Sequence, residues 1–442
     1  MKKILLILAE IVIFQFIIVL NLYSQTEILK WKDGKSSCVS ITYDDGSINQ
    51  FKVAMPVMDR LGLPGTFYVN SGNFNGSKYY PTFAGRPIME ILKESETVPA
   101  SQANLFERTS MVSYLRDVEK VPELSDYNIS KYVSNIQRGQ LEEVFNTLNE
   151  ICIVLRKSNK VFNARPVQNK AIDNTTTWED LVKYSEKGHE FACHTISHRQ
   201  LSLLDKNNII YELEMCREDI RDHLGFKHTL SVECPFGTHD ERVLTIAEPY
   251  FYFSRNSCPE DYIDVILRGY KRMPSECDRE YIQWQRGALS KTPYSLMTSW
   301  IDTSIQDNVW LVLVFHGIEG IGYEAVPGAT IENYFSYIKE NEDNVWVATF
   351  QDGYKYIRER MNTKIRESAK KGTITIELSN ELDKKIYDIP LTLQTKVPDD
   401  WKVVQVRQGK SLKKIKSIAK DGSNWVIYNV VPDNTPVRLS KG

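Results

Sequence analysis

A strand–helix–strand pattern near the amino end constrains the fold of this chain more than any other feature. Residues 38–43 form an apolar run that stops at Asp44, and residues 65–69 form a second apolar run. Between them, apolar residues recur at helical spacing, and Gly62 is the stop signal of that stretch. Two strands joined by a helix pair in parallel, because the connection is long enough to return the chain to the same end of the sheet. The pattern predicts an α/β fold with a parallel sheet.

The same alternation resumes after a long interval. Thr177 and Asp180 form a capping pair for a helix over 178–186. The run 310–315 is apolar throughout, as is typical of a strand buried on both faces. The remaining elements expected here are a helix over 205–225, strands near 230–232 and 250–253, and a strand at 345–350 followed by a helix from 352 to about 367.

Length and local pattern divide the chain into domains. Its 442 residues exceed what one hydrophobic core usually holds. We expect an α/β domain over 26–368, with a helical insertion at about 72–177, where the sequence is polar and its helical periodicity is patchy. From residue 373 onward, short alternating strands are separated by turn residues, so that 369–442 are expected to form a small β-sandwich.

Residues 1–25 have the order of a secretory signal peptide. Lys2 and Lys3 precede an apolar run over 4–20, and polar residues follow it. Glu10 and Gln15 interrupt the run and would be costly at the centre of a bilayer, so a cleaved signal is favoured over the alternative of a membrane anchor. We therefore expect a secreted or periplasmic protein of the cell envelope, with no stable membrane insertion after cleavage.

Charge and cysteine content argue against a nucleic-acid partner and against a fold held together by cysteines. The net charge is −2 and no basic stripe is present, so a nucleic-acid partner is not expected. The seven cysteines are odd in number and widely spaced, which excludes a small disulfide framework, and without a C-x-x-C pattern a structural zinc site on cysteine is not expected. The sequence does not indicate an oligomeric state.

Acidic or imidazole side chains follow three of the expected strands. Asp44 and Asp45 follow the first, His194 and His198 follow a middle one, and His316 follows the most apolar one. The carboxyl ends of parallel strands are where α/β folds place their sites. Each feature alone has a structural explanation, because Asp-Asp-Gly is usually a turn and a histidine after a strand is usually structural. Together, with the i, i+4 spacing of the histidine pair, they favour a metal site.

In this order the motifs resemble those of the polysaccharide deacetylases of carbohydrate esterase family 4, which share the NodB homology domain. Residues 42–46 (Thr-Tyr-Asp-Asp-Gly) match the family's Thr-Phe-Asp-Asp-Gly with Tyr for Phe, and residues 194–198 (His-Thr-Ile-Ser-His) match His-(Ser/Thr)-x-x-His. Residues 314–316 (Val-Phe-His) are similar to the late Leu-x-His motif. The resemblance covers roughly residues 36–75 and 175–360. It implies a distorted (β/α) barrel.

The resemblance also implies a hydrolase that removes N- or O-acetyl groups from an acetylated polysaccharide. Asp45, His194 and His198 would bind one divalent metal ion, usually zinc in this family. Asp44 would be the base that activates water, and His316 would be the acid that protonates the leaving group. The motifs do not distinguish among peptidoglycan, poly-N-acetylglucosamine, chitin fragments and acetylated xylan as the polymer.

The chain departs from the family pattern at the third motif, Arg-x-Pro-Tyr-Gly, which reads Glu-Cys-Pro-Phe-Gly here. Phe236 retains a backbone N–H for the oxyanion, but Glu233 replaces the arginine that pairs with the base. A second carboxylate near Asp44 would raise the pKa of that group. We expect Arg255, which ends the next strand, to bridge both carboxylates through its fork of donors.

The fourth motif, an Asp and a Trp that help to form the acetyl pocket, is not recognisable. Candidates for its tryptophan are Trp284, Trp300 and Trp310, and candidates for further cleft residues are His239 and Asp240. The missing arginine leaves an alternative function, that of a carbohydrate-binding protein of this fold that has lost turnover. The presence of both a base and an acid counts against it, because binding alone requires neither.

Overall fold

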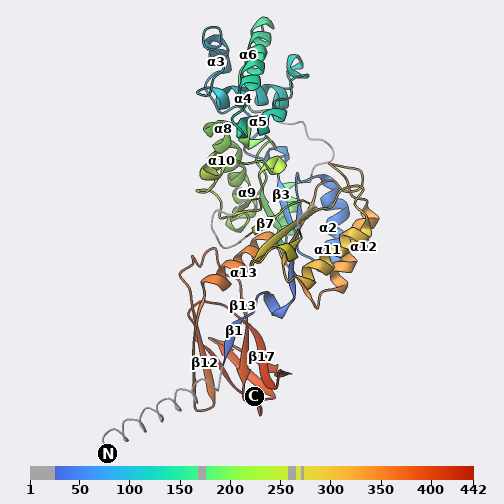
Figure 1. The fold of residues 1–442 in the computed structure, drawn as a ribbon, viewed down its shortest axis with the longest axis vertical. Coiled ribbons are helices and arrows are strands. Elements are labelled where there is room, and N and C mark those ends of the chain that lie inside the picture. The colour runs from blue at the N-terminus through green and yellow to red at the C-terminus, as the bar shows by residue number, and fades with distance from the viewer. Residues whose placement is uncertain (1–24, 168–175, 257–264, 270–272) are drawn as a thin grey trace, which may run out of the picture.

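The computed structural model describes residues 25–167, 176–256, 265–269 and 273–442. Figure 1 shows three parts along the long axis: a helical part at one end, an α/β part in the middle and a β-rich part at the other end. The signal peptide expected over 1–25 lies, apart from Gln25, outside the described residues. Within them, the structure has no helix of the length and apolarity needed to span a bilayer.

The middle part is built on a parallel sheet that forms a half-barrel, which confirms the α/β fold predicted from the sequence. The strand order is β6-β5-β4-β3-β2-β9-β8-β7, and β10 pairs with the start of β2. Its strands are β2 (Ser37–Tyr43), β3 (Thr66–Val69), β4 (Glu190–Cys193), β5 (Ser231–Val232), β6 (Phe253–Ser254), β7 (Val265–Leu267), β8 (Ile282–Gly287), β9 (Trp310–Phe315) and β10 (Val345–Val347). The central strand β2 is buried along its whole length, because it has neighbouring strands on both sides and its side chains pack into a hydrophobic core on each face.

Helices connect these strands and bury one face each against the sheet. Gly62 ends α2 in the left-handed conformation, at φ 66°, and the Thr177 hydroxyl caps α7 by accepting the Asp180 N–H. The expected single helix over 205–225 consists of α8 and α9, joined by a π-turn. The helices are α2 (Met55–Leu61), α7 (Trp178–Glu186), α8 (Lys206–Ile210), α9 (Cys216–Leu224), α10 (Glu241–Ala247), α11 (Tyr294–Gln306), α12 (Gly328–Glu340) and α13 (Phe350–Asn362).

The segment between β3 and α7 supplies the helical part of the molecule (Figure 1). Its helices are α3 (Ile88–Glu94), α4 (Leu105–Ser113), α5 (Val133–Gln137) and α6 (Glu142–Lys157). They share a hydrophobic core of their own, which Leu203 joins from the α/β part. The buried Arg199 side chain links the two parts, since it donates to the Ser110 carbonyl at 2.8 Å.

The chain beyond α13, together with β1 from the amino end, forms two antiparallel sheets that share one core. One sheet contains β1 (Thr26–Ile28), β13 (Leu391–Val397), β17 (Ser423–Val430) and β16 (Ile418–Lys420), and the other contains β11 (Lys364–Lys370), β12 (Thr373–Ser379), β18 (Val437–Lys441), β14 (Val403–Gln408) and β15 (Ser411–Lys416). The helix expected to reach about residue 367 ends at Asn362, because the next residues pair with β12 as strand β11. The division into domains at 368/369 stays a prediction.

Candidate active site

The carboxyl ends of neighbouring strands line one cavity of about 510 Å³. Parallel pairing brings these ends together, and Asp44, His194 and His316 each lie one position past the end of their strand. The Asp44 N–H donates to the Phe315 carbonyl at 2.9 Å, and the His194 N–H donates to the Val69 carbonyl at 3.0 Å. The cavity is lined by Asp44, Asp45, His194, His198, Glu233, Phe236, Gly237, Arg255, Asn256, Arg268, Gln285, Val314, His316 and Tyr323.

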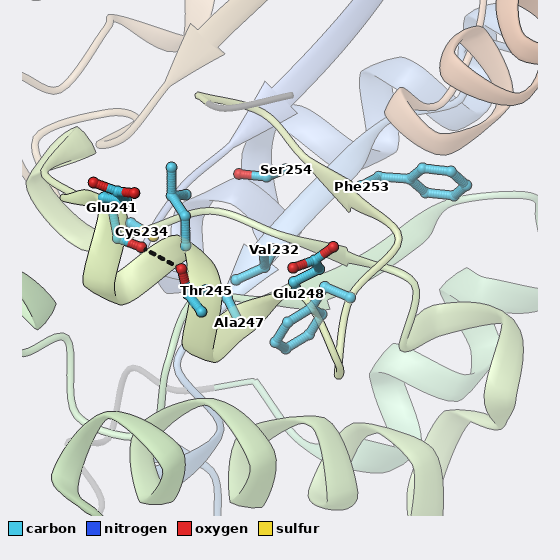
Figure 2. A pocket seen from close by; sticks show the side chains of 10 residues that line it. Val232, Cys234, Glu241, Thr245, Ala247, Glu248, Phe253 and Ser254 are labelled. Carbon is cyan, nitrogen blue, oxygen red and sulfur yellow. Dashed lines mark hydrogen bonds between the residues drawn. The ribbon is translucent and has the colours of Figure 1, made fainter. Parts of the chain in front are cut away.

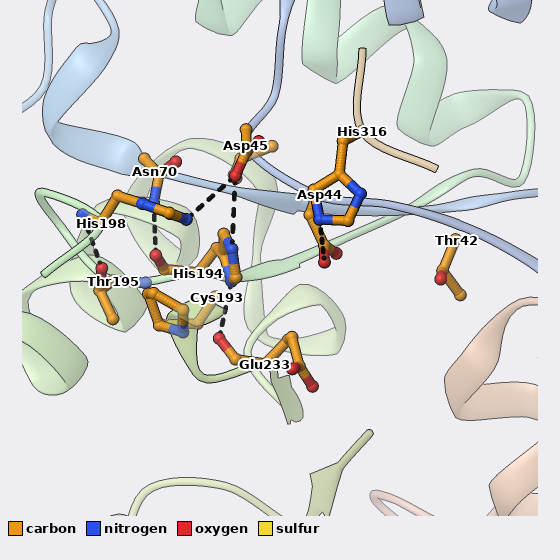
Figure 3. Close-up of polar contacts among 12 residues, drawn as sticks. Thr42, Asp44, Asp45, Asn70, Cys193, His194, Thr195, His198, Glu233 and His316 are labelled. Carbon is orange, nitrogen blue, oxygen red and sulfur yellow. Dashed lines mark hydrogen bonds and ion pairs between the residues drawn. The ribbon is translucent and has the colours of Figure 1, made fainter. Parts of the chain in front are cut away.

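Three of the predicted residues converge as metal ligands do. Asp45 Oδ1 lies 3.1 Å from His198 Nε2 and 3.6 Å from His194 Nε2, and the three ligand atoms all lie within 4.8 Å of one another. Figure 3 shows the Asp45 carboxylate between the two imidazoles. Asp45 Oδ1 is buried and makes no hydrogen bond among the described residues. One carboxylate oxygen and two imidazole nitrogens form a donor set that suits a divalent ion with open coordination positions.

The surroundings of His194 fix the orientation of its ring. Its Nδ1 lies 2.7 Å from the Glu233 carbonyl oxygen, which requires a proton on Nδ1 and leaves Nε2 free to bind an ion. Burial raises the pKa of Asp45, but the His194 and His198 imidazoles beside the carboxylate outweigh burial, so that this pKa lies well below its usual value. The carboxylate is therefore ionised wherever the protein is folded near neutral pH.

Several residues of the site have left-handed backbone conformations that side chains other than glycine rarely adopt. They are Asp45 (φ 74°), Thr195 (φ 71°), His198 (φ 58°) and Phe236 (φ 60°). Such conformations cost free energy and persist only where the surrounding structure enforces them. In the histidine motif, the Glu212 carboxylate enforces the turn by accepting both the N–H and the hydroxyl of Ser197.

The Asp44 carboxylate faces the Arg255 guanidinium, the position expected for this arginine from the sequence. Arg255 donates to Asp44 Oδ1 at 2.8 Å and to Oδ2 at 2.6 Å, and its Nε lies 3.4 Å from Glu233 Oε2. All three residues are buried, with exposed fractions of 4% or less. Burial raises the pKa of Asp44, and the charge of Arg255, with further help from His194, outweighs it, so that the pKa of Asp44 lies below its usual value.

The pKa of Glu233 is shifted upward, in the opposite direction to that of Asp44, although the two carboxyl groups share the same surroundings. Burial, partly offset by Arg255 and reinforced by Asp44, raises the pKa of Glu233 to about 7. The Asn256 amide donates to Glu233 Oε1, and the side chains of Gln283 and Gln285 donate to the Arg255 carbonyl at 2.7 and 2.8 Å. These amides hold the bridging arginine in place.

His316 lies beside Asp44, with its Nε2 3.5 Å from Asp44 Oδ2 (Figure 3). Its imidazole is partly exposed to the cavity, at 27%. Gln50, fully buried at the start of the helix after β2, donates to the carbonyls of both Asp44, at 2.5 Å, and His316, at 2.8 Å. Gln50 therefore fixes the spacing between the two strand ends that carry these residues.

Other residues considered from the sequence have structural positions. Trp284, Trp300 and Trp310 are buried in hydrophobic cores and do not line the cavity. Asp240 caps α10 by accepting the Val243 N–H at 2.8 Å, so it does not line the cavity either, and neither does His239. Gln50, Asn256 and Glu212 were not predicted from the sequence. Glu212 interrupts the apolar face of the expected helix over 205–225, but it carries no motif by which it could be recognised.

A second, smaller cavity of about 220 Å³ lies beside the site, between α10 and strands β5 and β6 (Figure 2). Its lining is largely apolar and includes Val232, Cys234 and Phe253. Successive residues of a strand point to opposite faces, so Glu233 faces the larger cavity while its two neighbours face the smaller one. None of the predicted site residues lines the smaller cavity.

Comparisons with known proteins agree with the motifs. Residues 147–252 match the sequence model of the polysaccharide deacetylase family. A gellan lyase from a Bacillus species is 23% identical over 299 residues, which cover 61% of this chain and 11% of that protein. The chain thus spans about a tenth of the length of this curated relative.

Solved structures of family 4 carbohydrate esterases are similar at low sequence identity. The enzyme from Bacillus anthracis is 12% identical, with a TM-score of 0.33, and the alignment covers 72% of this chain and 83% of the enzyme. The enzyme from Bacillus subtilis is 11% identical, with a TM-score of 0.32, and the alignment covers 72% of this chain and 80% of the enzyme. From the family match and the motifs, we conclude that the chain contains a polysaccharide deacetylase domain.

Proposed function

We propose that this protein is a metal-dependent deacetylase that hydrolyses N- or O-acetyl groups of a polysaccharide. The observation that carries the proposal is the convergence of Asp45, His194 and His198 in a cavity that also holds Asp44 and His316. Hydrolysis of an acetyl group requires a polarised carbonyl, an activated water and a proton donor. The cavity brings together residues suited to each requirement.

Asp45, His194 and His198 would hold the divalent ion, for which zinc is our first candidate. When bound, the ion would polarise the acetyl carbonyl and lower the pKa of a nearby water. Asp44 accepts a proton from the attacking water, whose oxygen bonds to the carbonyl carbon. The Phe236 N–H stabilises the negative charge that develops on the carbonyl oxygen. His316 donates a proton to the departing nitrogen or oxygen as its bond to carbon breaks, and acetate leaves.

Arg255 acts on this reaction through Asp44 and is a positioning residue. Its guanidinium supplies the cation that the family's own arginine would supply from position 233. Two buried carboxylates without a neighbouring cation would retain protons, and a protonated Asp44 could not act as a base. The relocated arginine therefore removes the main argument for a carbohydrate-binding protein without turnover, which remains the alternative.

The experiment that tests the proposal measures acetate release from acetylated polysaccharides by the protein loaded with zinc, with and without a chelator. We expect release that the chelator abolishes and that added metal restores. Binding of the same polymers without any acetate release would favour the carbohydrate-binding alternative. The name of the Bacillus relative connects it with a polysaccharide, gellan, which belongs in the panel.

We also propose that the protein acts outside the cytoplasm, since residues 1–25 have the order of a signal peptide. Amino-terminal sequencing of the protein recovered from the medium or periplasm tests this. A mature chain that starts near residue 26 is the expected result, and a cell-associated protein that retains Met1 would contradict it.

A further inference from the structure

The walls of the catalytic cavity carry two exposed aromatic rings, one beside each end of the row of site residues. Phe236 is 62% exposed, and its ring centroid lies 4.8 Å from that of His198. Tyr323 is 64% exposed, and its ring centroid lies 5.5 Å from that of His316, at an interplanar angle of 78°. Figure 3 shows that the two histidines lie on opposite sides of Asp45. Exposed rings that line a cavity suit stacking on sugar rings.

The loop that carries Tyr323 is held in a fixed shape. The Gly317 N–H donates to the Tyr323 carbonyl at 2.8 Å, and the Val326 N–H donates to the Gly317 carbonyl at 2.9 Å. Gly317 packs directly against Gly322, where a Cβ on Gly317 would lie 2.7 Å from the Gly322 carbonyl carbon. The ring is therefore presented by a rigid hairpin. Because rings flank the site on both sides, a polymer can extend beyond it in both directions.

Arg268 adds a positive charge at the Phe236 end of the cavity. It directly follows β7, at the same edge of the sheet as the other site residues, and it lines the cavity. Its guanidinium rests on Gly237, the neighbour of Phe236, and its Nη1 lies 3.4 Å from the Gly237 carbonyl oxygen. A Cβ at Gly237 would collide with this guanidinium, and Gly237 has φ 60°, so position 237 requires glycine.

Within the part of the chain that the structure describes, Arg268 has no carboxylate at ion-pair distance. By contrast, Arg255, the other arginine in the cavity lining, is bound to two carboxylates. The planar fork of a guanidinium matches a carboxylate, which it binds through two parallel hydrogen bonds. A divalent ion on Asp45, His194 and His198 would add further positive charge to the same cavity.

We propose that the substrate is an acidic polysaccharide, in which a sugar next to the acetylated one carries a carboxylate that binds Arg268. This inference rests on the proposed deacetylase function and names its substrate class. The acetyl group lies at the metal site, Tyr323 stacks on the polymer at the His316 end, and the carboxylated sugar lies between Phe236 and Arg268. Arg268 is a specificity residue here, and it takes no part in bond breaking.

The test compares two forms of one probe, an O-acetylated oligogalacturonate and the same oligomer with its carboxyl groups methyl-esterified. Acetate release is measured for the metal-loaded protein and for Arg268→Gln, Arg268→Lys and the control Arg438→Gln, an exposed arginine in β18. We expect the protein to prefer the free acid by at least about tenfold in kcat/KM, mainly through KM, as one charged hydrogen-bonded pair provides. The preference should fall with rising salt.

Arg268→Gln should remove the preference, Arg268→Lys should retain part of it, and Arg438→Gln should leave it unchanged. Equal rates on both forms, or a preference that survives Arg268→Gln, would overturn the inference. Release of acetate from neutral polymers alone would overturn it while the proposed function stands. Release from no polymer, acidic or neutral, would overturn the proposed function and the inference together.

Discussion

Replacing Arg255 by alanine tests the charge arrangement on which the proposed base depends. Arg255 is 2% exposed, and its guanidinium lies between Asp44 and Glu233, which are 4% and 1% exposed. Its removal leaves two buried carboxyl groups without their cation. Leaving a buried charge unpaired costs about 3–5 kcal/mol when the group cannot adapt. A carboxyl group can adapt by retaining its proton, so we expect the pKa of Asp44 to rise.

The size of that rise follows from the contact that is lost. An opposite charge at hydrogen-bonding distance lowers the pKa of a carboxyl group by about 1–3 units. Asp44 acts as a base only when ionised, so the acid limb of kcat/KM against pH should move upward by a similar amount. Each unit of displacement lowers the rate about tenfold at pH values below the limb. Arg255→Lys should restore part of the loss, because an ammonium supplies the charge but not the fork.

The assay is the pH profile of acetate release, with thermal unfolding to verify that each variant folds. Arg108→Ala is the matched control, because Arg108 is equally buried but lies in the helical insertion, where it donates to the Val98 carbonyl. We expect this control to lose stability with no displacement of the acid limb. The exchange Glu233→Arg with Arg255→Glu places the cation where the family has it. It should recover at least about tenfold in rate over Arg255→Glu alone.

An acid limb that stays in place in folded Arg255→Ala would refute the reasoning, since Asp44 would then owe its ionisation to something else. The same conclusion would follow if the exchange recovered no activity. A uniform loss at every pH would show that Arg255 maintains geometry and not charge.

Further predictions concern the metal, the base and a buried acid. His198→Ala should lose zinc in dialysis followed by metal analysis, whereas His239→Ala should keep it; retention by both would exclude His198 as a ligand. Asp44→Asn should retain zinc but release no acetate, and full activity would rule out the assigned base. Burial raises the pKa of Glu359 to about 8, against the opposing N–H of Ile389. Between about pH 4.5 and 8 the folded protein retains a proton that the unfolded chain loses. The free energy of unfolding therefore falls as the pH rises through this range, by up to about 1.4 kcal/mol per pH unit. Urea unfolding should show that Glu359→Gln reduces the slope of stability against pH in this range, and an unchanged slope would contradict the assignment.

The sequence determined the parts of this protein that depend on local pattern. The apolar run that became β2, the helix stop at Gly62 and the cap at Thr177 were readable because strand burial and helix ends have local signals. The carboxyl ends of parallel strands meet at one edge. The positions of Asp45, His194 and His198 along the chain were therefore enough to predict that they converge, as the structure shows. Their roles remain proposals.

Features that depend on pairing between distant segments were decided by the tertiary structure. Residues 364–370 carry a helix-compatible pattern but became β11, because an open sheet edge at β12 satisfies their backbone groups. The candidate tryptophans are buried in cores, since their large apolar area is more stable there than in a polar cavity.

Within the site, local pattern identified the residues that can do chemistry but not those that hold them. Gln50 and Asn256 belong to no motif, and only the approach of separate strand ends gives their amides carbonyl or carboxylate partners. The contact of the Arg268 guanidinium with Gly237 likewise joins segments that are remote in the chain. Catalytic motifs can be recognised in the sequence because the chemistry requires particular side chains. Many different side chains can hold those residues in place, so that only the three-dimensional contacts identify which ones do.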